Sequence, residues 1–281
     1  MIDFVTVNNL RLRYFFLDNK QAENFLFLPG WGGDLKTWQK FLEELAIDAP
    51  FNIYFLELPG FGESDLPPEA WRVADYAACV KSAVIKLGLN KFSLFGHSFG
   101  GSIAVYLACH EPEMVSKLFL SGPAIIRNPK KPLHLPNFLR ALLRYEIFKI
   151  LRKKIYSTFF ASTDYAVLDN PIMKQTFINV TSEDGQEWFK KITQPVEMFW
   201  GRQDNLTPLE QGLTLKTDLP HAELTIIEEA RHGLHLQQAE ELQRLIKEKF
   251  KALMPPPSAS EVWQEANKTP EPKKEIDDNL F

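Results

Sequence analysis

The sequence has few of the features that mark secreted, membrane-spanning or disulfide-stabilised proteins. Its 281 residues include only two cysteines. Cys79 and Cys109 both fall in helical patterns among apolar neighbours, which predicts buried packing residues and suits a reducing compartment. There is no apolar run of about 18 residues, so no transmembrane helix is expected, and residues 1–16 lack the basic start and long apolar stretch of a signal peptide. We therefore expect a cytoplasmic protein.

Charge of one sign is not in excess either. The 32 Lys and Arg residues nearly balance the 36 Asp and Glu residues, and the net charge of −4 gives no indication of nucleic-acid binding. The glycine-rich stretches are not followed by Lys-Ser or Lys-Thr, which excludes a phosphate-binding loop of that type. No internal repeat is present, and no cofactor or metal is expected. With 45% hydrophobic residues, the chain is long enough to bury the core of one α/β domain.

What the sequence does contain is a serine between a predicted strand and a predicted helix. Residues 91–101 read KFSLFGHSFGG, which begins with an apolar run typical of a buried parallel strand and leads into a helical pattern over residues 101–110. The Gly-x-Ser-x-Gly around Ser98 has the spacing of a nucleophile elbow, in which the two glycines let strand and helix approach closely. Such a short pattern also occurs by chance, and the flanking strand and helix are what favour a catalytic serine.

Strands and helices alternate along most of the chain. This order predicts an α/β fold with a mostly parallel twisted sheet, helices on both faces, and functional residues at the carboxyl ends of the strands. Strands are expected at Ile2–Val7, Leu10–Phe16, Asn24–Leu28, Asn52–Leu56, residues 92–95, Val115–Ser121, Val196–Trp200 and Glu223–Ile227, the first two as an antiparallel hairpin. Helices are expected at Trp38–Leu45, Val73–Leu87, Gly101–His110, Leu209–Lys216 and Ala239–Leu253.

One segment interrupts this alternation. Residues 123–192 contain no clear strand and are interpreted as a helical insertion, which divides the core into residues 1–122 and 193–254. Residues 123–160 carry nine basic side chains against one acid, Glu146. Three interpretations stay open for these charges: a solvated helix face, attraction of an anionic substrate, or contact with a bilayer surface.

The end of the chain has a different composition. After three consecutive prolines, residues 255–281 are polar and poor in apolar side chains, which predicts a disordered tail. The tail ends in the sequence IDDNLF, where apolar residues alternate with acids. Two interpretations remain for this end, a solubilising tail without contacts and a short motif that docks weakly on a partner or on the basic insertion.

Two residues after predicted strands supply the groups that a nucleophilic serine needs. A serine hydroxyl is a weak nucleophile near neutral pH and requires a base, which in turn requires an orienting carboxylate. Asp204 follows the expected strand at residues 196–200, and His232 follows the expected strand at residues 223–227. The order Ser, Asp, His along the chain is the one that accompanies a strand–turn–helix elbow.

The other histidines are weaker candidates for the base. His235 is the main rival, because it shares a loop with His232, but His232 comes earlier, where the chain leaves the strand, and His235 is expected to begin the packing of the last helix. His97 adjoins the serine, and we expect its side chain to point elsewhere. His110, His134 and His221 lie at a helix end, in the insertion and before a strand.

An oxyanion that forms during attack on a carbonyl needs two N–H donors. The backbone N–H of Phe99, directly after the serine, lies at the start of a helix and provides one of them. The loop after the strand at residues 24–28 is the natural source of the second, and Trp31, between two glycines, is the expected donor. An ordinary tight turn would have the same composition, and the position of the loop after a strand favours the site.

Taken together, these segments resemble the α/β-hydrolase-fold superfamily, in its cap-bearing branch of serine carboxylesterases, thioesterases and carbon–carbon bond hydrolases. The resemblance lies in LPGWGG, ELPGFGESD, GHSFGG, PVEMFWGRQDNLTP and EEARHGLHLQQAEEL and covers residues 1–253. It implies a catalytic triad of Ser98 as nucleophile, His232 as base and Asp204 as orienting acid, with Trp31 and Phe99 at the oxyanion hole.

The resemblance also implies a cap role for the insertion at residues 123–192. The chain departs from the family at one place, where Pro29-Gly30 stands before the oxyanion residue instead of the usual His-Gly. The expected function is hydrolysis of a small-molecule ester or thioester through an acyl-enzyme, the substrate being anionic if the basic insertion attracts it. The alternatives are carbon–carbon hydrolysis of a diketone by the same triad and a non-catalytic binding protein on this fold.

Overall fold

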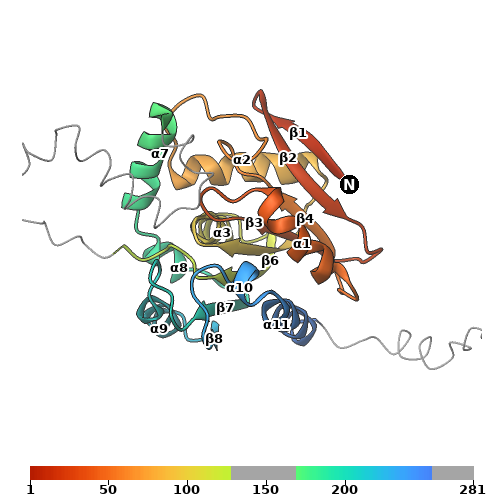
Figure 1. Cartoon of the computed structure of the whole chain (residues 1–281), viewed down its shortest axis with the longest axis vertical. Helices are drawn as coiled ribbons and strands as arrows, with labels where there is room; N and C mark the ends of the chain where they lie inside the picture. The colour runs from red at the N-terminus through yellow and green to blue at the C-terminus, as the bar shows by residue number, and fades with distance from the viewer. Residues whose placement is uncertain (128–168, 255–281) are drawn as a thin grey trace, which may run out of the picture.

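Eight strands of the described residues pair into one sheet in the computed structural model, in the order β1-β2-β4-β3-β5-β6-β7-β8 (Figure 1). The structure describes residues 1–127 and 169–254. The strands are β1 Ile2–Val7, β2 Leu10–Leu17, β3 Asn24–Leu28, β4 Asn52–Leu56, β5 Phe92–His97, β6 Val115–Ser121, β7 Val196–Gly201 and β8 Glu223–Ile227. The β1–β2 and β2–β4 pairs are antiparallel and the other five are parallel. The predicted mostly parallel sheet is therefore confirmed.

The helices follow the predicted alternation with small shifts at their ends. They are α1 Leu35–Ala46, α2 Val73–Lys86, α3 Phe99–His110, α7 Pro171–Ser182, α8 Gln186–Phe189, α9 Leu209–Asp218, α10 Leu234–Gln237 and α11 Ala239–Ala252. α1 begins three residues before the predicted Trp38, because the Asp34 side chain accepts a hydrogen bond from the backbone N–H of Thr37 and caps the first turn.

The edge hairpin is closed by two asparagines. Asn8 and Asn9 both have positive φ, 49° and 65°, and connect β1 to β2 in a two-residue turn. Successive residues with positive φ match the right-handed twist of the flanking strands, and asparagine tolerates this conformation better than other non-glycine residues. The predicted antiparallel hairpin at the edge of the sheet is thus found with its turn at the expected pair.

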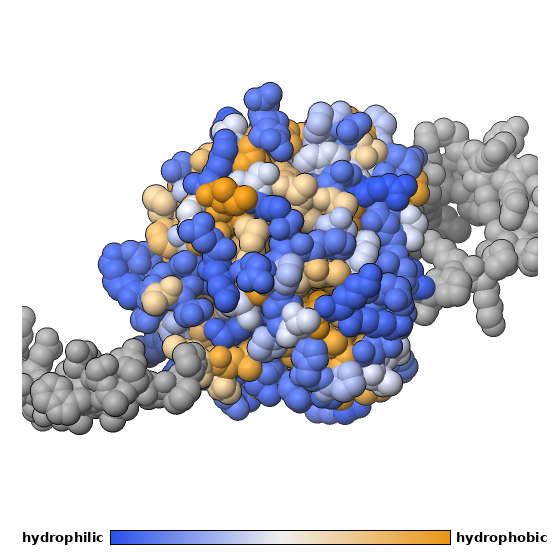
Figure 2. All heavy atoms as spheres, turned by 180° about the vertical axis from the view of Figure 1, so that it is seen from behind, coloured by the Kyte–Doolittle hydropathy of each residue, from blue (hydrophilic) through white to orange (hydrophobic). Residues whose placement is uncertain are grey.

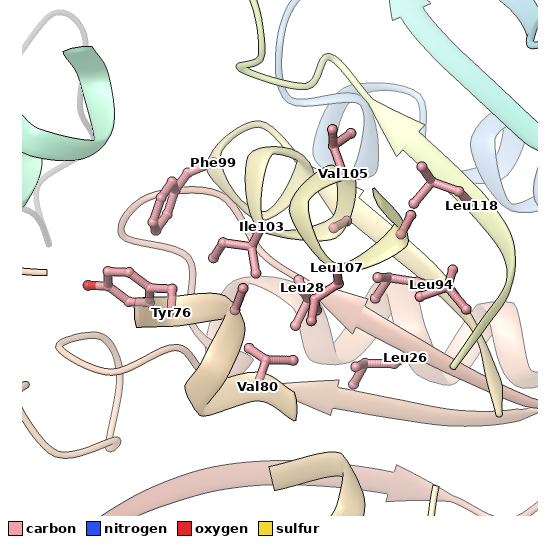
Figure 3. Close-up of a cluster of buried hydrophobic side chains, with 14 of the residues drawn as sticks. Leu26, Leu28, Tyr76, Val80, Leu94, Phe99, Ile103, Val105, Leu107 and Leu118 are labelled. Carbon is pink, nitrogen blue, oxygen red and sulfur yellow. The ribbon is translucent and has the colours of Figure 1, made fainter. Parts of the chain in front are cut away.

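The central strands are apolar on both faces, and the two faces carry different side chains. In β3, Leu26 and Leu28 join one buried cluster with residues of α2 and α3, while Phe25 and Phe27 join a second with residues of α1 and α11. Figure 3 shows the first cluster, in which Ile103 of α3 packs near the leucines of the sheet. Burial on both faces explains why these strands read as continuous apolar runs rather than alternating ones.

Hydrogen bonds join the described residues at the two ends of the expected insertion. The Arg127 guanidinium donates to the carbonyl oxygens of Val180 and Glu183, at 2.9 and 3.1 Å, and the Gly185 N–H donates to the Ile125 carbonyl at 2.9 Å. α7 and α8 belong to this segment. The rest of the insertion and the tail, with the basic stretch and the IDDNLF end, lie outside the described residues. The division into core and cap stays a prediction.

The two cysteines differ in their exposure. Cys79, on α2, is buried, and burial raises the pKa of its thiol to about 12. Cys109, on α3, is only partly buried, so the prediction of a fully buried packing residue is wrong there. It lies one residue before the end of α3.

The surface carries mainly hydrophilic residues. On the face shown in Figure 2, apolar residues form scattered patches between them. No helix in residues 1–127 and 169–254 is long and apolar enough to cross a membrane.

Candidate active site

Ser98 lies at the tip of a strained turn between β5 and α3. Its backbone has φ 51° and ψ −114°, a conformation that non-glycine residues rarely adopt. The flanking glycines allow the close approach predicted for them: a Cβ on Gly96 would lie 2.6 Å from the Gly100 carbonyl oxygen, and one on Gly100 would lie 2.4 Å from the Leu28 carbonyl oxygen. Side chains at either position would therefore force strand and helix apart.

The turn is held by hydrogen bonds to the end of the neighbouring strand. The Ser98 N–H donates to the Ser121 carbonyl at 3.0 Å, and the Ser98 carbonyl accepts from the Ala124 N–H at 2.9 Å. These bonds attach the serine to residues on both sides of Gly122. Gly122 has φ +47°, and a Cβ there would lie 3.0 Å from Asp204 Oδ2 and 3.2 Å from His232 Nδ1. The elbow and the Asp204–His232 pair thus meet at one residue.

Asp204 and His232, the residues predicted to act as orienting acid and base, are in hydrogen-bond contact. His232 Nδ1 lies 2.7 Å from Asp204 Oδ2. The other carboxylate oxygen, Oδ1, accepts from the backbone N–H groups of Leu206 and Thr207 at 2.8 and 2.9 Å. Because a carboxylate only accepts, the Nδ1 of His232 carries the proton toward it, which leaves Nε2 as the basic nitrogen.

The environment of Asp204 favours its ionised form. Burial alone would raise the pKa of this carboxyl, whose residue is 5% exposed. The hydrogen bond and charge of His232, together with the hydrogen bonds from Thr207, outweigh burial, and the pKa of Asp204 lies below its ordinary value. A carboxylate that stays charged is what an adjacent imidazole needs when it takes up a proton.

Two further histidines surround His232. His97 was expected to point elsewhere, but its ring lies 4.9 Å from the His232 ring, because its Nδ1–H donates to the Ser121 carbonyl at 3.0 Å and turns the ring beneath the elbow. His235 stacks on Trp38 at 3.9 Å and lies 5.0 Å from His97. Burial and the charge of His232 lower the pKa of His97 well below its ordinary value and that of His235 to about 3. Both imidazoles are therefore neutral near pH 7.

The loop after β3 reaches the serine. A Cβ on Gly30 would lie 3.2 Å from the Ser98 Cβ, so the chain passes directly beside the nucleophile before Trp31. Among the described residues, the backbone N–H groups of Trp31 and Phe99 have no hydrogen-bond partner. Unpaired donors on both sides of a serine are the arrangement that an oxyanion requires. The Pro29 that replaces the family histidine leaves this loop in contact with the elbow.

An aromatic cluster lies next to these donors. The Trp31 ring contacts Phe61 at 4.8 Å, Phe177 of α7 at 5.1 Å and Phe99 of α3 at 5.5 Å. Tyr76 of α2 contacts Phe99 edge-on at 5.0 Å, and Figure 3 shows these two rings side by side. Three helices, α2, α3 and α7, and the loops after β3 and β4 thus contribute rings to this cluster.

A buried carboxylate that the sequence analysis did not identify, Glu57, holds together two loops near the candidate site. Glu57, directly after β4, is 1% exposed, and its oxygens accept from the N–H groups of Leu35 and Glu63 at 2.7 and 2.8 Å. It therefore connects the start of α1 to the loop that carries Phe61. Burial raises the pKa of Glu57 despite these bonds. The acid in ELPGFGESD was the signal, but one of its partners, Leu35, lies 22 residues away along the chain.

Thr207 was also missed. It stands three residues after Asp204, within the stretch NLTP, at the spacing that lets a side chain and a carboxylate close a turn. Within residues 1–127 and 169–254, no group of three or more His, Cys, Asp or Glu residues is arranged to hold a metal ion.

Comparisons with known proteins agree with this fold. The family model described as alpha/beta hydrolase fold matches residues 23–151. The chain is 26% identical over 268 residues to the 2-hydroxy-6-oxo-6-phenylhexa-2,4-dienoate hydrolase of Burkholderia cepacia, covering 86% of this chain and 93% of that protein.

Two solved structures share the fold at low sequence identity. The meta-cleavage product hydrolase of Pseudomonas fluorescens has a TM-score of 0.69 at 18% identity, covering 90% of this chain and 98% of that one. A thermophilic esterase of Thermogutta terrifontis has a TM-score of 0.70 at 19% identity, covering 90% and 98%. The family model and these likenesses show that the chain has the α/β-hydrolase fold.

Proposed function

We propose that this chain is a serine hydrolase that cleaves a carboxylic ester or thioester through an acyl-enzyme, with Ser98 as nucleophile, His232 as general base and Asp204 as orienting acid. The observation that carries the proposal is the strained Ser98 turn, which meets the Asp204–His232 pair at Gly122. Strain at one residue, supported by hydrogen bonds on both sides, is characteristic of a functional position.

In the first half-reaction, the Ser98 hydroxyl oxygen attacks the substrate carbonyl and its proton passes to Nε2 of His232. Asp204 stabilises the imidazolium that forms, through the 2.7 Å contact at Nδ1. The backbone N–H groups of Trp31 and Phe99 stabilise the negative oxygen of the tetrahedral intermediate. Its collapse breaks the bond to the leaving alcohol or thiol, which takes the proton from His232.

In the second half-reaction, water attacks the acyl-enzyme while His232 again accepts a proton. Collapse of the second tetrahedral intermediate releases the carboxylic acid and returns the proton to Ser98. Both half-reactions use only the side chains and backbone N–H groups named above, together with water.

A second candidate is carbon–carbon bond hydrolysis, in which the same triad attacks a ketone and the leaving group is a carbon atom. The named activities of the dienoate hydrolase and the meta-cleavage product hydrolase favour it. The resemblance to an esterase favours the first candidate. The two share every step at Ser98, and they differ in the group that accepts the proton from His232.

Parallel assays on three substrates separate the candidates. The purified chain is given a nitrophenyl ester, an acyl thioester and 2-hydroxy-6-oxo-6-phenylhexa-2,4-dienoate, and kcat/KM is measured for each. Ester or thioester turnover well above that of the dienoate supports the first candidate, and the reverse order supports the second. If none of the three substrates is turned over and Ser98 does not react with a fluorophosphonate probe, the assignment as a serine hydrolase is contradicted.

The aromatic cluster beside Ser98 supports an apolar, ring-bearing acyl group. Phe177 is half buried and contacts Trp31, so we expect its replacement by alanine to raise KM for a phenylacetyl ester by about 5- to 10-fold, the range that one aromatic contact contributes. An acetyl ester, which has no ring to contact Phe177, should be affected much less. The measurement is KM for both esters.

The neighbouring Ile178 provides the matched control. It lies on the same helix but is 50% exposed, and Ile178→Ala should leave KM for both esters unchanged. Equal effects of the Phe177 substitution on the phenylacetyl and acetyl esters would show that Phe177 supports the fold rather than the acyl group.

A further inference from the structure

The Thr207 hydroxyl contacts three polar groups next to the His232 imidazole. Its Oγ1 lies 2.9 Å from Asp204 Oδ2, 3.2 Å from His232 Nδ1 and 3.2 Å from the Gly122 carbonyl oxygen. The residue is 5% exposed. The hydroxyl therefore stands at the meeting point of the acid, the base and the strand end that holds the elbow.

The hydrogen bonds of Asp204 can be counted. A carboxylate has about four acceptor sites, and Asp204 uses two at Oδ1 for the backbone N–H groups of Leu206 and Thr207. Oδ2 accepts from His232 Nδ1–H at 2.7 Å. The threonine hydroxyl has a single proton and two acceptors within reach, Asp204 Oδ2 at 2.9 Å and the Gly122 carbonyl at 3.2 Å, and the shorter contact favours donation to Oδ2. Each oxygen of Asp204 then accepts two hydrogen bonds.

Hydrogen bonds of the Thr207 backbone fix the position of its hydroxyl group. The Thr207 N–H donates to Asp204 Oδ1 at 2.9 Å, and its carbonyl accepts from the indole N–H of Trp200 at 2.7 Å. Trp200 belongs to β7 and is fully buried. Because a β-branched side chain is also restricted at χ1, the hydroxyl has little freedom to leave the carboxylate.

We propose that Thr207 is a positioning residue of the catalytic pair, whose hydroxyl holds Asp204 Oδ2 in line with Nδ1–H of His232 and so keeps Nε2 as the free, proton-accepting nitrogen. The role rests on the proposed function of Ser98, Asp204 and His232. Thr207 does not contact the reacting atoms in this scheme, and it acts through the carboxylate. Charge-assisted hydrogen bonds of this kind are stronger than neutral ones and restrict geometry more tightly.

The test compares Thr207→Val, which removes the hydroxyl at nearly constant shape, with Thr207→Ser, which keeps it. We expect Thr207→Val to lower kcat on an acetyl ester by about 10- to 100-fold, the range for a hydrogen bond to a charged group, while KM stays within about twofold. Thr207→Ser should recover most of kcat. The low-field proton resonance of His232 Nδ1 should be present in the parent and in Thr207→Ser, and broadened or lost in Thr207→Val.

Thr176 offers a matched control. It is fully buried on α7, and its Oγ1 accepts from the Trp71 N–H at 3.0 Å, away from the triad. Thr176→Val should lower the free energy of unfolding but leave kcat on the acetyl ester and the Nδ1 resonance unchanged. This control separates loss of a buried hydroxyl from loss of the hydroxyl at Asp204.

Three results would overturn the proposal: parent-like kcat and Nδ1 resonance in Thr207→Val, equal impairment of Thr207→Val and Thr207→Ser, or an equal loss of kcat in Thr176→Val. The resonance requires only the Asp204–His232 pair, so it is read without turnover. If the parent shows the resonance but hydrolyses nothing and does not react with a fluorophosphonate, the proposed function fails, while the role of Thr207 is still decided by the spectra.

Discussion

Replacement of Ser98 by alanine should lower ester hydrolysis by about 10⁴- to 10⁶-fold, because the nucleophile of the acyl-enzyme is lost while binding and the oxyanion donors remain. The fold should survive the change. The bonds that hold the turn, to the Ser121 carbonyl and from the Ala124 N–H, are made by the backbone of residue 98. The measurements are kcat/KM on the best ester and the midpoint of chemical unfolding, which we expect to stay within about 1 kcal/mol of the parent in free energy.

Ser102, one helical turn further along α3, is the control for this substitution. Ser102 is buried, and its hydroxyl donates to the Ala124 carbonyl at 2.6 Å. Ser102→Ala should cost about 1 kcal/mol of stability for the lost hydrogen bond and keep turnover within about threefold. A fluorophosphonate should label Ser102→Ala and leave Ser98→Ala unlabelled. More than a tenth of the parent activity in Ser98→Ala would contradict the assignment of the nucleophile.

The fold was predictable because its signals are local. A strand that is covered on both faces must be apolar at successive positions, so residues 24–28 could be identified without knowing their neighbours. The glycine spacing around Ser98 was equally informative, because a Cβ on Gly96 of β5 would lie only 2.6 Å from the Gly100 carbonyl oxygen of α3. The helix starts were less certain, as α1 depends on a single capping side chain, Asp34.

Candidate site residues could be identified from the sequence where they follow the ends of strands. Residues whose position depends on contacts with distant parts of the chain could not. Asp204 and His232 lie just after β7 and β8, which is where a parallel sheet gathers functional groups. The role of Thr207 depends on Gly122, 85 residues earlier, whose carbonyl lies beside its hydroxyl. His97 was misplaced for the same reason, since its direction is fixed by the carbonyl of Ser121 on the next strand.

His232→Ala should be as damaging as loss of the serine, whereas changes at His235 should keep substantial turnover. His235 was the main rival for the base, and its surroundings argue against that role. It is 7% exposed, stacked on Trp38 at 3.9 Å, and its pKa is lowered to about 3 by burial and by the charge of His232. A base with so low a pKa would accept a proton from serine poorly near neutral pH.

His235→Phe is the sharper variant, because it keeps a flat ring against Trp38, while His235→Ala opens a cavity and should cost about 2–4 kcal/mol of stability. We expect His235→Phe to stay within about tenfold of the parent kcat. The dependence of kcat on pH should be the same in His235→Phe as in the parent, since His235 is already neutral above about pH 4 when its pKa is about 3. A changed pH profile in His235→Phe, or a greater loss of kcat there than in His232→Ala, would place the base three residues further along the chain.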